Sequence, residues 1–136
     1  MILALAFAWS VVVNYYCGRP APIKDVMITK STSLNVKRGL TAYFEEYGHF
    51  PIGANSNMMK VLAGGNIEGQ NPKQLTFLHF ADKKRYNDKV EVVDSWSKPI
   101  VFKSSGDGNL VIYSVGENGV DDGGKLDDIA LVISPP

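Results

Sequence analysis

The residues most able to do chemistry lie in one acidic loop near the C-terminus, residues 116–128, with the sequence GENGVDDGGKLDD. This loop holds five of the 14 acidic residues of the chain and only one base, and four glycines interrupt it. Apolar segments flank it on both sides, so we expect it to join two strands. Hard cations such as calcium take about six to eight oxygen ligands, and a glycine-rich backbone can fold around such an ion. The pattern therefore indicates either a solvated turn or a cation site.

The candidate ligands of such a cation are side-chain and backbone oxygens. Side-chain oxygens come from Asn118, Asp121, Asp122, Asp127 and Asp128, and carbonyls come from Val115 and residues 119–123. The spacing does not fit an EF-hand loop, because no glutamate stands at the twelfth position. Carboxylates at contact distance repel one another without an ion, and their sign excludes an anion site.

Catalysis is a weaker interpretation of the same residues. The chain has two histidines and one cysteine, and it lacks a G-x-S-x-G nucleophile motif and a phosphate-binding glycine loop. The pairs Asp121–Asp122 and Asp127–Asp128 lie on a glycine-rich loop, without the apolar pocket that would separate their pKa values. We therefore predict that the chain is not an enzyme, and a hydrolase that uses Asp127 or Asp128 is the remaining catalytic hypothesis. A net charge of zero argues against nucleic-acid binding.

The loop must be positioned by a helix and a set of short strands. Apolar residues repeat at helical spacing over residues 23–47, and the stripe consists of Ile23, Val26, Val36, Leu40, Tyr43, Phe44 and Tyr47. Gly48 and Pro51 are typical of a helix end. A shorter helix is expected at 56–62, and 74–80 is ambiguous between a strand and a turn. Strands are predicted at 90–93, 100–103, 110–115 and 129–133, with a hairpin turn at Asp107–Gly108.

These elements predict an α+β fold in which one long N-terminal helix packs on a small antiparallel β-sheet with a C-terminal metal-binding loop. Residues 1–18 carry no charge and are predicted to be a hydrophobic membrane or filament helix segment. A cleaved signal peptide is the competing interpretation. The globular domain then covers 19–136, with the helix at 23–47 and the sheet within 90–133. Both interpretations place this domain outside the cytoplasm.

The whole layout resembles the major pseudopilin of bacterial type II secretion systems, within the type IV pilin-like family. An apolar N-terminus runs into an amphipathic helix that ends in LTAYFEEYGHFP, residues 40–51, similar to the family's Tyr and Gly-aromatic-Pro exit. DSWSKPIVF, residues 94–102, is similar to the family's D-x-W-G-x-P-aromatic turn. YSVGENGVDDGGKLDDI, residues 113–129, is similar to S-x-G-x-D-G followed by an acidic loop that ends in Asp-Ile.

The resemblance implies that the C-terminal loop binds Ca2+ and that the ion holds the end of the sheet together. Asn118 stands where the family usually has its first aspartate, Asp127 and Asp128 match the acidic pair, and Val115 matches a carbonyl donor. Asp121 or Asp122 is a further ligand, and we favour Asp122. Two departures stand out: Ser97 replaces the usual glycine after the tryptophan, and the prepilin start with its assembly glutamate is absent. Either the sequence is truncated at its N-terminus, or this relative no longer assembles by the usual route.

The implied function is that of a structural pseudopilin subunit in a type II protein secretion filament. Its expected partners are further copies in a helical filament, other pseudopilins, the secretion machinery and the membrane, but no nucleic acid. The expected location is the inner membrane, crossed once, with the globular domain in the periplasm. The alternatives are a type IV pilin subunit for adhesion or DNA uptake, and a secreted calcium-stabilised binding module.

Overall fold

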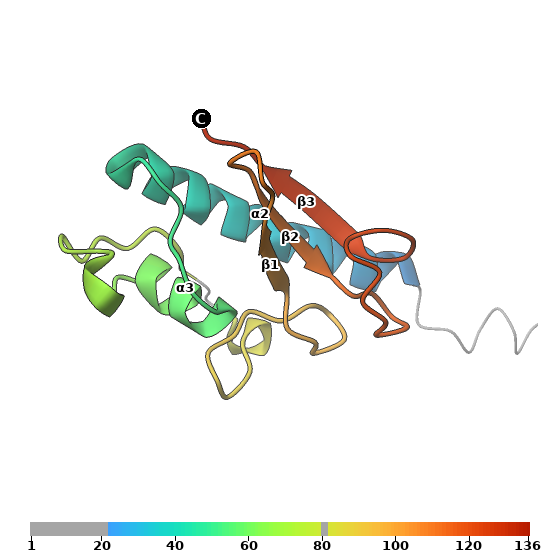
Figure 1. Cartoon of the computed structure of the whole chain (residues 1–136). Helices are drawn as coiled ribbons and strands as arrows, with labels where there is room; N and C mark the ends of the chain where they lie inside the picture. The colour runs from blue at the N-terminus through green and yellow to red at the C-terminus, as the bar shows by residue number, and fades with distance from the viewer. Residues whose placement is uncertain (1–21, 80–81) are drawn as a thin grey trace, which may run out of the picture.

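The computed structural model describes residues 22–79 and 82–136, which form an α+β fold (Figure 1). Helix α2 (Pro22–Tyr47) lies along one face of a three-stranded sheet, and the shorter helix α3 (Asn55–Leu62) packs beside it. Two short 3₁₀ helices follow at Ile67–Gly69 and Lys83–Arg85. No helix in the described part of the chain is long and apolar enough to span a membrane. The segment predicted at 1–18 lies outside the described residues.

The prediction of a long helix over 23–47 is confirmed, with one error at its start. Val36, Leu40 and Tyr43 are fully buried, as the helical period predicted. Ile23 is 69% exposed, so the extension of the apolar stripe to this residue is wrong. The buried face continues upstream through polar residues instead, because Thr29 Oγ1 accepts a hydrogen bond from the backbone N–H of Ser95 at 3.1 Å.

Helix α2 ends where the sequence predicted. The backbone N–H of Gly48 donates to the carbonyl of Phe44 at 2.7 Å, and Gly48 has φ +77°. That left-handed conformation costs glycine nothing, so the chain can turn away after Tyr47.

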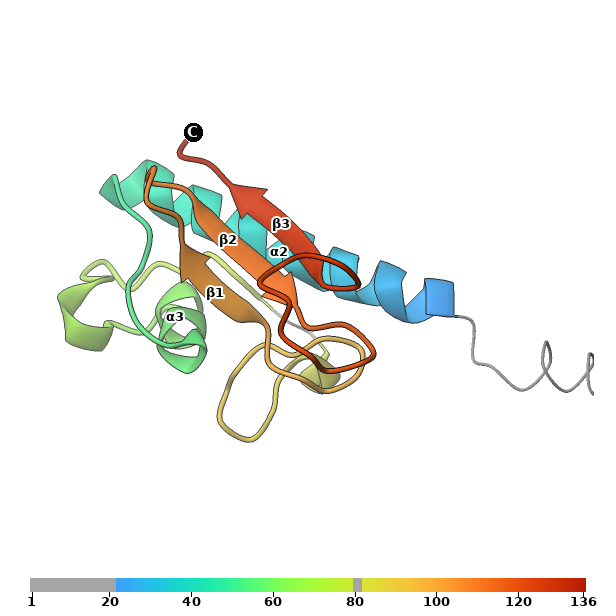
Figure 2. The same cartoon turned by 45° about the vertical axis from the view of Figure 1, so that its right-hand side comes forward.

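The sheet is an antiparallel meander in the order β1-β2-β3 (Figure 2). Its strands are β1 (Val101–Ser104), β2 (Leu110–Ser114) and β3 (Ile129–Ile133). Ile112 of β2 pairs with Phe102 on one side and Leu131 on the other. The hairpin turn at Asp107–Gly108 is confirmed, with Gly108 at φ +85°.

The strand predicted at 90–93 is wrong. Within it only Val92 and Val93 form bridges, to Tyr86 and Pro99, and Val90 has φ +63°. The side chain of Asn55 in α3 explains the difference, since its Oδ1 accepts the Val92 N–H at 2.9 Å and its amide donates to the Val92 carbonyl at 3.2 Å. A side chain of a helix thus takes the Val92 N–H that a neighbouring strand would need, while the Val92 carbonyl also accepts the backbone N–H of Ile100 at 3.0 Å.

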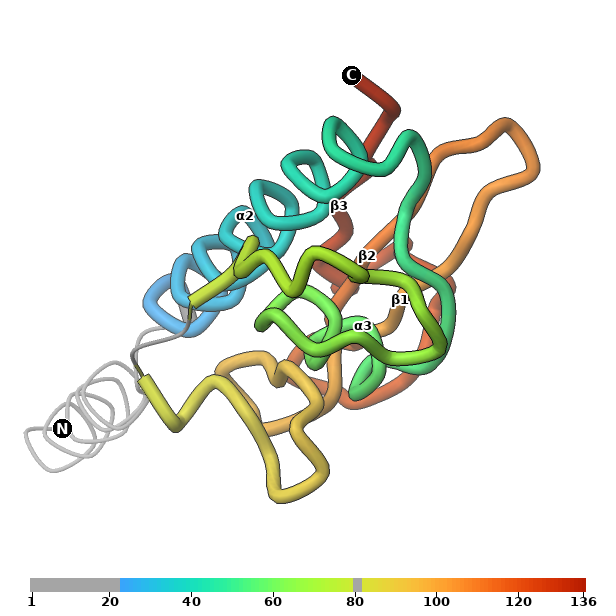
Figure 3. Tube along the Cα trace, turned by 90° about the vertical axis from the view of Figure 1, so that its left-hand side faces the viewer, coloured from blue at the N-terminus to red at the C-terminus, as the bar shows by residue number. Residues whose placement is uncertain are grey.

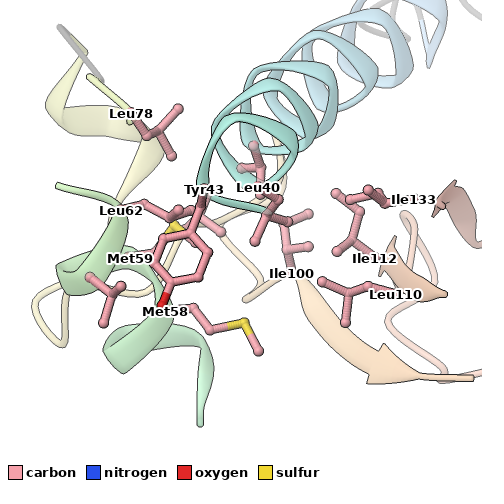
Figure 4. Packing of buried hydrophobic residues seen from close by; sticks show 13 residues of the cluster. Leu40, Tyr43, Met58, Met59, Leu62, Leu78, Ile100, Leu110, Ile112 and Ile133 are labelled. Atoms are coloured by element: carbon pink, nitrogen blue, oxygen red, sulfur yellow. The ribbon is translucent and has the colours of Figure 1, made fainter. Parts of the chain in front are cut away.

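The core forms where α2, α3 and the sheet meet (Figure 4). The buried residues labelled there include Leu40, Tyr43, Met58, Met59, Leu62, Ile100, Leu110, Ile112 and Ile133. Tyr43 is buried, and its hydroxyl donates to the carbonyl of Gln70 at 2.6 Å, which satisfies its polar end. The aromatic stripe of α2 is therefore a packing surface, as its spacing predicted.

The segment between α3 and the sheet returns past α2 (Figure 3). Residues 74–79 form neither of the predicted elements: the N–H groups of Phe77 and Leu78 both donate to the carbonyl of Leu62. This segment packs directly on Gly39 of α2, where an added Cβ would lie 3.2 Å from the carbonyl oxygen of Phe77. Asn71 fixes this segment to the end of α3, because its buried amide donates to the carbonyls of Val61 and Leu75.

The turn after Asp94 contains a strained serine. Ser97 has φ +63°, and its N–H donates to the Asp94 carbonyl at 3.1 Å. A non-glycine residue in this left-handed region costs about 1–2 kcal/mol. Replacement by glycine removes this cost, but glycine also makes the unfolded chain more flexible, which offsets part of the gain. We therefore expect Ser97→Gly to raise the free energy of unfolding by about 0.5–1 kcal/mol in urea titrations. Ser97→Ala keeps the strain and should give no gain; equal effects of the two variants would contradict the explanation.

Candidate metal centre

The acidic loop of residues 116–128 joins β2 to β3 and lies beyond the ends of these strands, in orange to red in Figures 1 and 2. Part of it folds back onto the sheet. A Cβ added at Gly124 would lie 3.4 Å from the Cβ of Ala130 and 3.7 Å from the ring of Tyr113. Tyr113 is only 3% exposed, so the loop has a packed base and does not project freely into solvent.

Three carboxylates of this loop converge. Carboxylate oxygens of Asp122, Asp127 and Asp128 all lie within 4.8 Å of one another. Partial desolvation raises the pKa of Asp122, and the negative charges of Asp128 and Asp127 raise it further. Repulsion of this kind is what a bound cation removes. The structure therefore brings together three of the five residues that were predicted as metal ligands.

Asp128 shapes the loop around these carboxylates. One oxygen, Oδ2, accepts the N–H groups of Asp122 at 3.0 Å and Gly124 at 2.8 Å. The other oxygen, Oδ1, is buried and has no hydrogen-bond partner among the described residues. Buried polar atoms are nearly always paired, so an unpaired carboxylate oxygen is a suitable ligand for a cation. Among the atoms of the loop, Asp128 Oδ1 is the one that best matches a metal ligand.

Asn118 lies beside the cluster and orients it. Its amide donates to Asp127 Oδ1 at 2.7 Å, while its own Oδ1 accepts the N–H of Val120 at 2.7 Å. These contacts give Asn118 a positioning role in the loop. A direct bond from Asn118 to a metal stays a prediction. Val115 follows β2 directly and is half-buried, and its carbonyl as a ligand also stays a prediction.

Tyr113 gives Asp121 and Asp122 different surroundings in the loop. The Tyr113 hydroxyl donates to Asp121 Oδ1 at 3.0 Å, and the same oxygen accepts the N–H of Gly123 at 2.9 Å. Burial raises the pKa of Tyr113, and the hydrogen bond to Asp121 adds to this shift. Asp121 thus ties the loop to the sheet, whereas Asp122 belongs to the carboxylate cluster.

Lys98 was missed by the sequence analysis. Its ammonium group donates to the carbonyls of Gly116 and Glu117, both at 3.0 Å. Lys98 comes from the turn after Asp94, so the contact joins two motifs that lie far apart in the sequence. The contact also uses the absence of a side chain at Gly119, where a Cβ would lie 2.7 Å from the Lys98 ammonium. A single lysine in a turn carries no sequence signal for such a role.

Lys98 binds the first two residues of the loop, Gly116 and Glu117, which we call its neck, but it does not neutralise the carboxylates. In the described part of the chain the ion pairs are Lys73–Glu46 and Arg85–Asp82, and neither involves the cluster. All its donors are oxygens, which suits a hard cation such as calcium and not a thiolate-preferring or imidazole-preferring metal. The residues present therefore fit calcium, with Asp122, Asp127 and Asp128 as the side chains that would hold it.

Comparisons with known proteins do not assign this chain to a family. No protein-family model matches the sequence, and neither a curated protein nor a solved structure matches the chain. The resemblance to pseudopilins consequently rests on the motifs in the sequence.

Proposed function

We propose that this chain is a structural subunit of a type II secretion filament, similar to the major pseudopilin, and that calcium stabilises its C-terminal loop. The observation that carries the proposal is the placement of the acidic cluster. It lies in the last connection of a three-stranded meander that packs on one long N-terminal helix. The motifs that suggested the family lie at the end of α2, in the turn at Asp94 and in the loop after β2.

The proposed role needs no reacting group. The segment before α2 would anchor the subunit in the inner membrane and then in the filament, with the globular domain in the periplasm. Calcium would join Asp122 to Asp127 and Asp128, and so tie the loop after β2 to the residues directly before β3. A subunit whose surface loop is fixed in this way can make the same contacts at every position of a helical assembly.

The proposal is tested by deleting the gene in its own host and supplying it again on a plasmid. We expect the deletion to leave folded exoproteins inside the cell envelope, and we expect the full-length chain to restore their release. Loss of adhesion or DNA uptake with normal secretion would identify a type IV pilin instead. Sequencing the N-terminus of the mature protein separates the third alternative, because a soluble monomer cleaved near residue 8 would exclude a filament subunit.

A further inference from the structure

A groove of about 180 Å³ lies between α2 and strand β3. It is lined by Lys30, Ser33, Leu34, Ile129, Ala130 and Leu131. Because the strand order is β1-β2-β3, β3 is an edge strand, and one side of its backbone has no neighbouring strand within the described residues. Edges of this kind are places where another chain can dock.

Ser33 lies buried in the wall of this groove. The residue is 2% exposed, and its Oγ has no hydrogen-bond partner in the described part of the chain. Because Oγ itself is closed to solvent, Ser33 gives the groove a packing surface and offers no hydrogen bond to an occupant.

The groove has a basic rim. Lys30, Lys37 and Arg38 lie along the same side of α2 as Leu34, and none of the three takes part in an ion pair among the described residues. Leu34 is 46% exposed and also borders a second hollow, which is lined by the two bases Lys37 and Arg38 and by one acid, Glu45. An occupant of this surface should therefore be apolar at its centre and acidic around it.

The acidic loop of this same protein has that character. Leu126 is 87% exposed and Val120 is 57% exposed, and the exposed acids Glu117 and Asp121 lie in the same loop. Leu126 also has φ +55° in the turn closed by the bond from Asp128 N–H to the Lys125 carbonyl. A strained, exposed leucine gains nothing from packing within the described residues, and strain of this kind is often linked to function.

We propose that Leu126 and the surrounding acidic loop of one copy dock into the α2–β3 groove of a second copy. The apolar side chain fills the hollow beside Leu34. Glu117, which the carboxylate cluster does not use, faces the basic rim. The two surfaces differ, so a contact repeated from copy to copy is head-to-tail and builds an open chain of subunits unless the rotation closes it into a ring. This inference rests on the proposed filament function and names the contact that would build it.

Cysteine cross-linking between two differently tagged full-length copies tests the contact. Both copies carry Cys17→Ser; one carries Leu126→Cys and the other Leu34→Cys. We expect a disulfide-linked heterodimer under mild oxidation, because docking brings the two Cα atoms within the range of about 4.4–6.8 Å that a disulfide needs. The matched control replaces Leu34→Cys by Ile52→Cys, which is 73% exposed and lies away from the groove. Absence of the heterodimer, or equal yield in the control, would overturn the proposal.

Cells that express the two cysteine variants also separate this proposal from the filament function. Filaments that can be sheared off and seen by electron microscopy, without the cross-link, reject the docking and keep the filament. Absence of both rejects both proposals.

Leu126→Gly is a second test that does not depend on cross-linking geometry. Glycine relieves the left-handed strain, so the melting temperature should stay equal or rise. Removal of the apolar side chain should nevertheless weaken self-association about tenfold, measured as the concentration of full-length protein that gives half-maximal assembly. Ile52→Ser should leave both quantities unchanged. Wild-type assembly by Leu126→Gly would overturn the proposal, whereas reduced assembly of a fully stable variant would support it.

Discussion

Calcium at about a hundred times its dissociation constant should raise the melting temperature of this protein by roughly 10 °C, and a chelator should reverse the shift. An ion that binds only the folded state at that excess adds about 2.7 kcal/mol to the free energy of unfolding. In a domain of this size, each kcal/mol moves the melting temperature by about 4 °C. The effect follows from the cluster of Asp122, Asp127 and Asp128, which lacks a cationic partner among the described residues.

The pH dependence of the metal-free protein follows from Asp122. Desolvation first, and then the charges of Asp128 and Asp127, raise its pKa in the folded state above the ordinary aspartate value. A raised folded pKa means that the protonated form is favoured by folding, so stability is lost as pH rises through that pKa. With chelator present, the melting temperature should therefore carry a penalty at pH 7 that is absent below the ordinary aspartate pKa.

The variant Asp122→Asn separates repulsion from metal binding. In chelator at pH 7 it should melt above the wild type, because one of the mutually repelling charges is gone. In excess calcium it should melt below the wild type, because the ion has lost a ligand. Glu117→Gln removes an exposed charge from the same loop outside the cluster and should change neither value. Equal melting of the wild type with calcium and with chelator, measured by differential scanning calorimetry, would exclude the calcium site.

The helix and the meander could be predicted because their signals are local. The stripe of Val36, Leu40 and Tyr43 repeats at the helical period, and the turn at Asp107–Gly108 favours a hairpin by itself. The strand expected at 90–93 failed for a non-local reason. Asn55, far away in the sequence, accepts the backbone N–H of Val92, and no pattern within 90–93 predicts that contact.

The candidate site shows the same division. The acids that form the cluster were visible in the sequence, because charge and glycine content mark the loop. The sequence did not show which of Asp121 and Asp122 turns toward the cluster, since the answer depends on the hydroxyl of Tyr113 in β2. Lys98 could not be predicted either, because its partners are backbone carbonyls that carry no residue-specific signal.

Replacement of Asp94 by alanine should be the most damaging single change in the turn that positions Lys98. Asp94 is 2% exposed and satisfies three donors. Its Oδ1 accepts the N–H groups of Trp96 and Lys98, both at 2.9 Å, and its Oδ2 accepts the hydroxyl of Ser114 in β2 at 2.6 Å. The side chain therefore folds the turn and attaches it to the central strand at the same time.

Asp94→Ala leaves these donors without a partner, at a cost of about 1–3 kcal/mol for each buried one. We expect a total loss of about 3 kcal/mol or more from the free energy of unfolding, measured by urea titration. Asp94→Asn is the matched variant, since its amide oxygen can still accept the two backbone N–H groups while its nitrogen faces Ser114. It should lose less than half as much. Equal losses in the two variants would show that the charge, and not the hydrogen bonds, holds the turn.

The same variant links the turn to the metal centre. Lys98 follows the turn and fixes the carbonyls of Gly116 and Glu117 at the neck of the acidic loop. If the turn loosens, Lys98 no longer holds the neck of the loop. The binding of calcium must then also order the carboxylates, and this lowers the calcium affinity. Asp94→Ala should therefore weaken calcium binding in isothermal titration, although none of its atoms belongs to the cluster. Unchanged calcium affinity in a destabilised Asp94→Ala protein would mean that the loop orders itself independently of the turn.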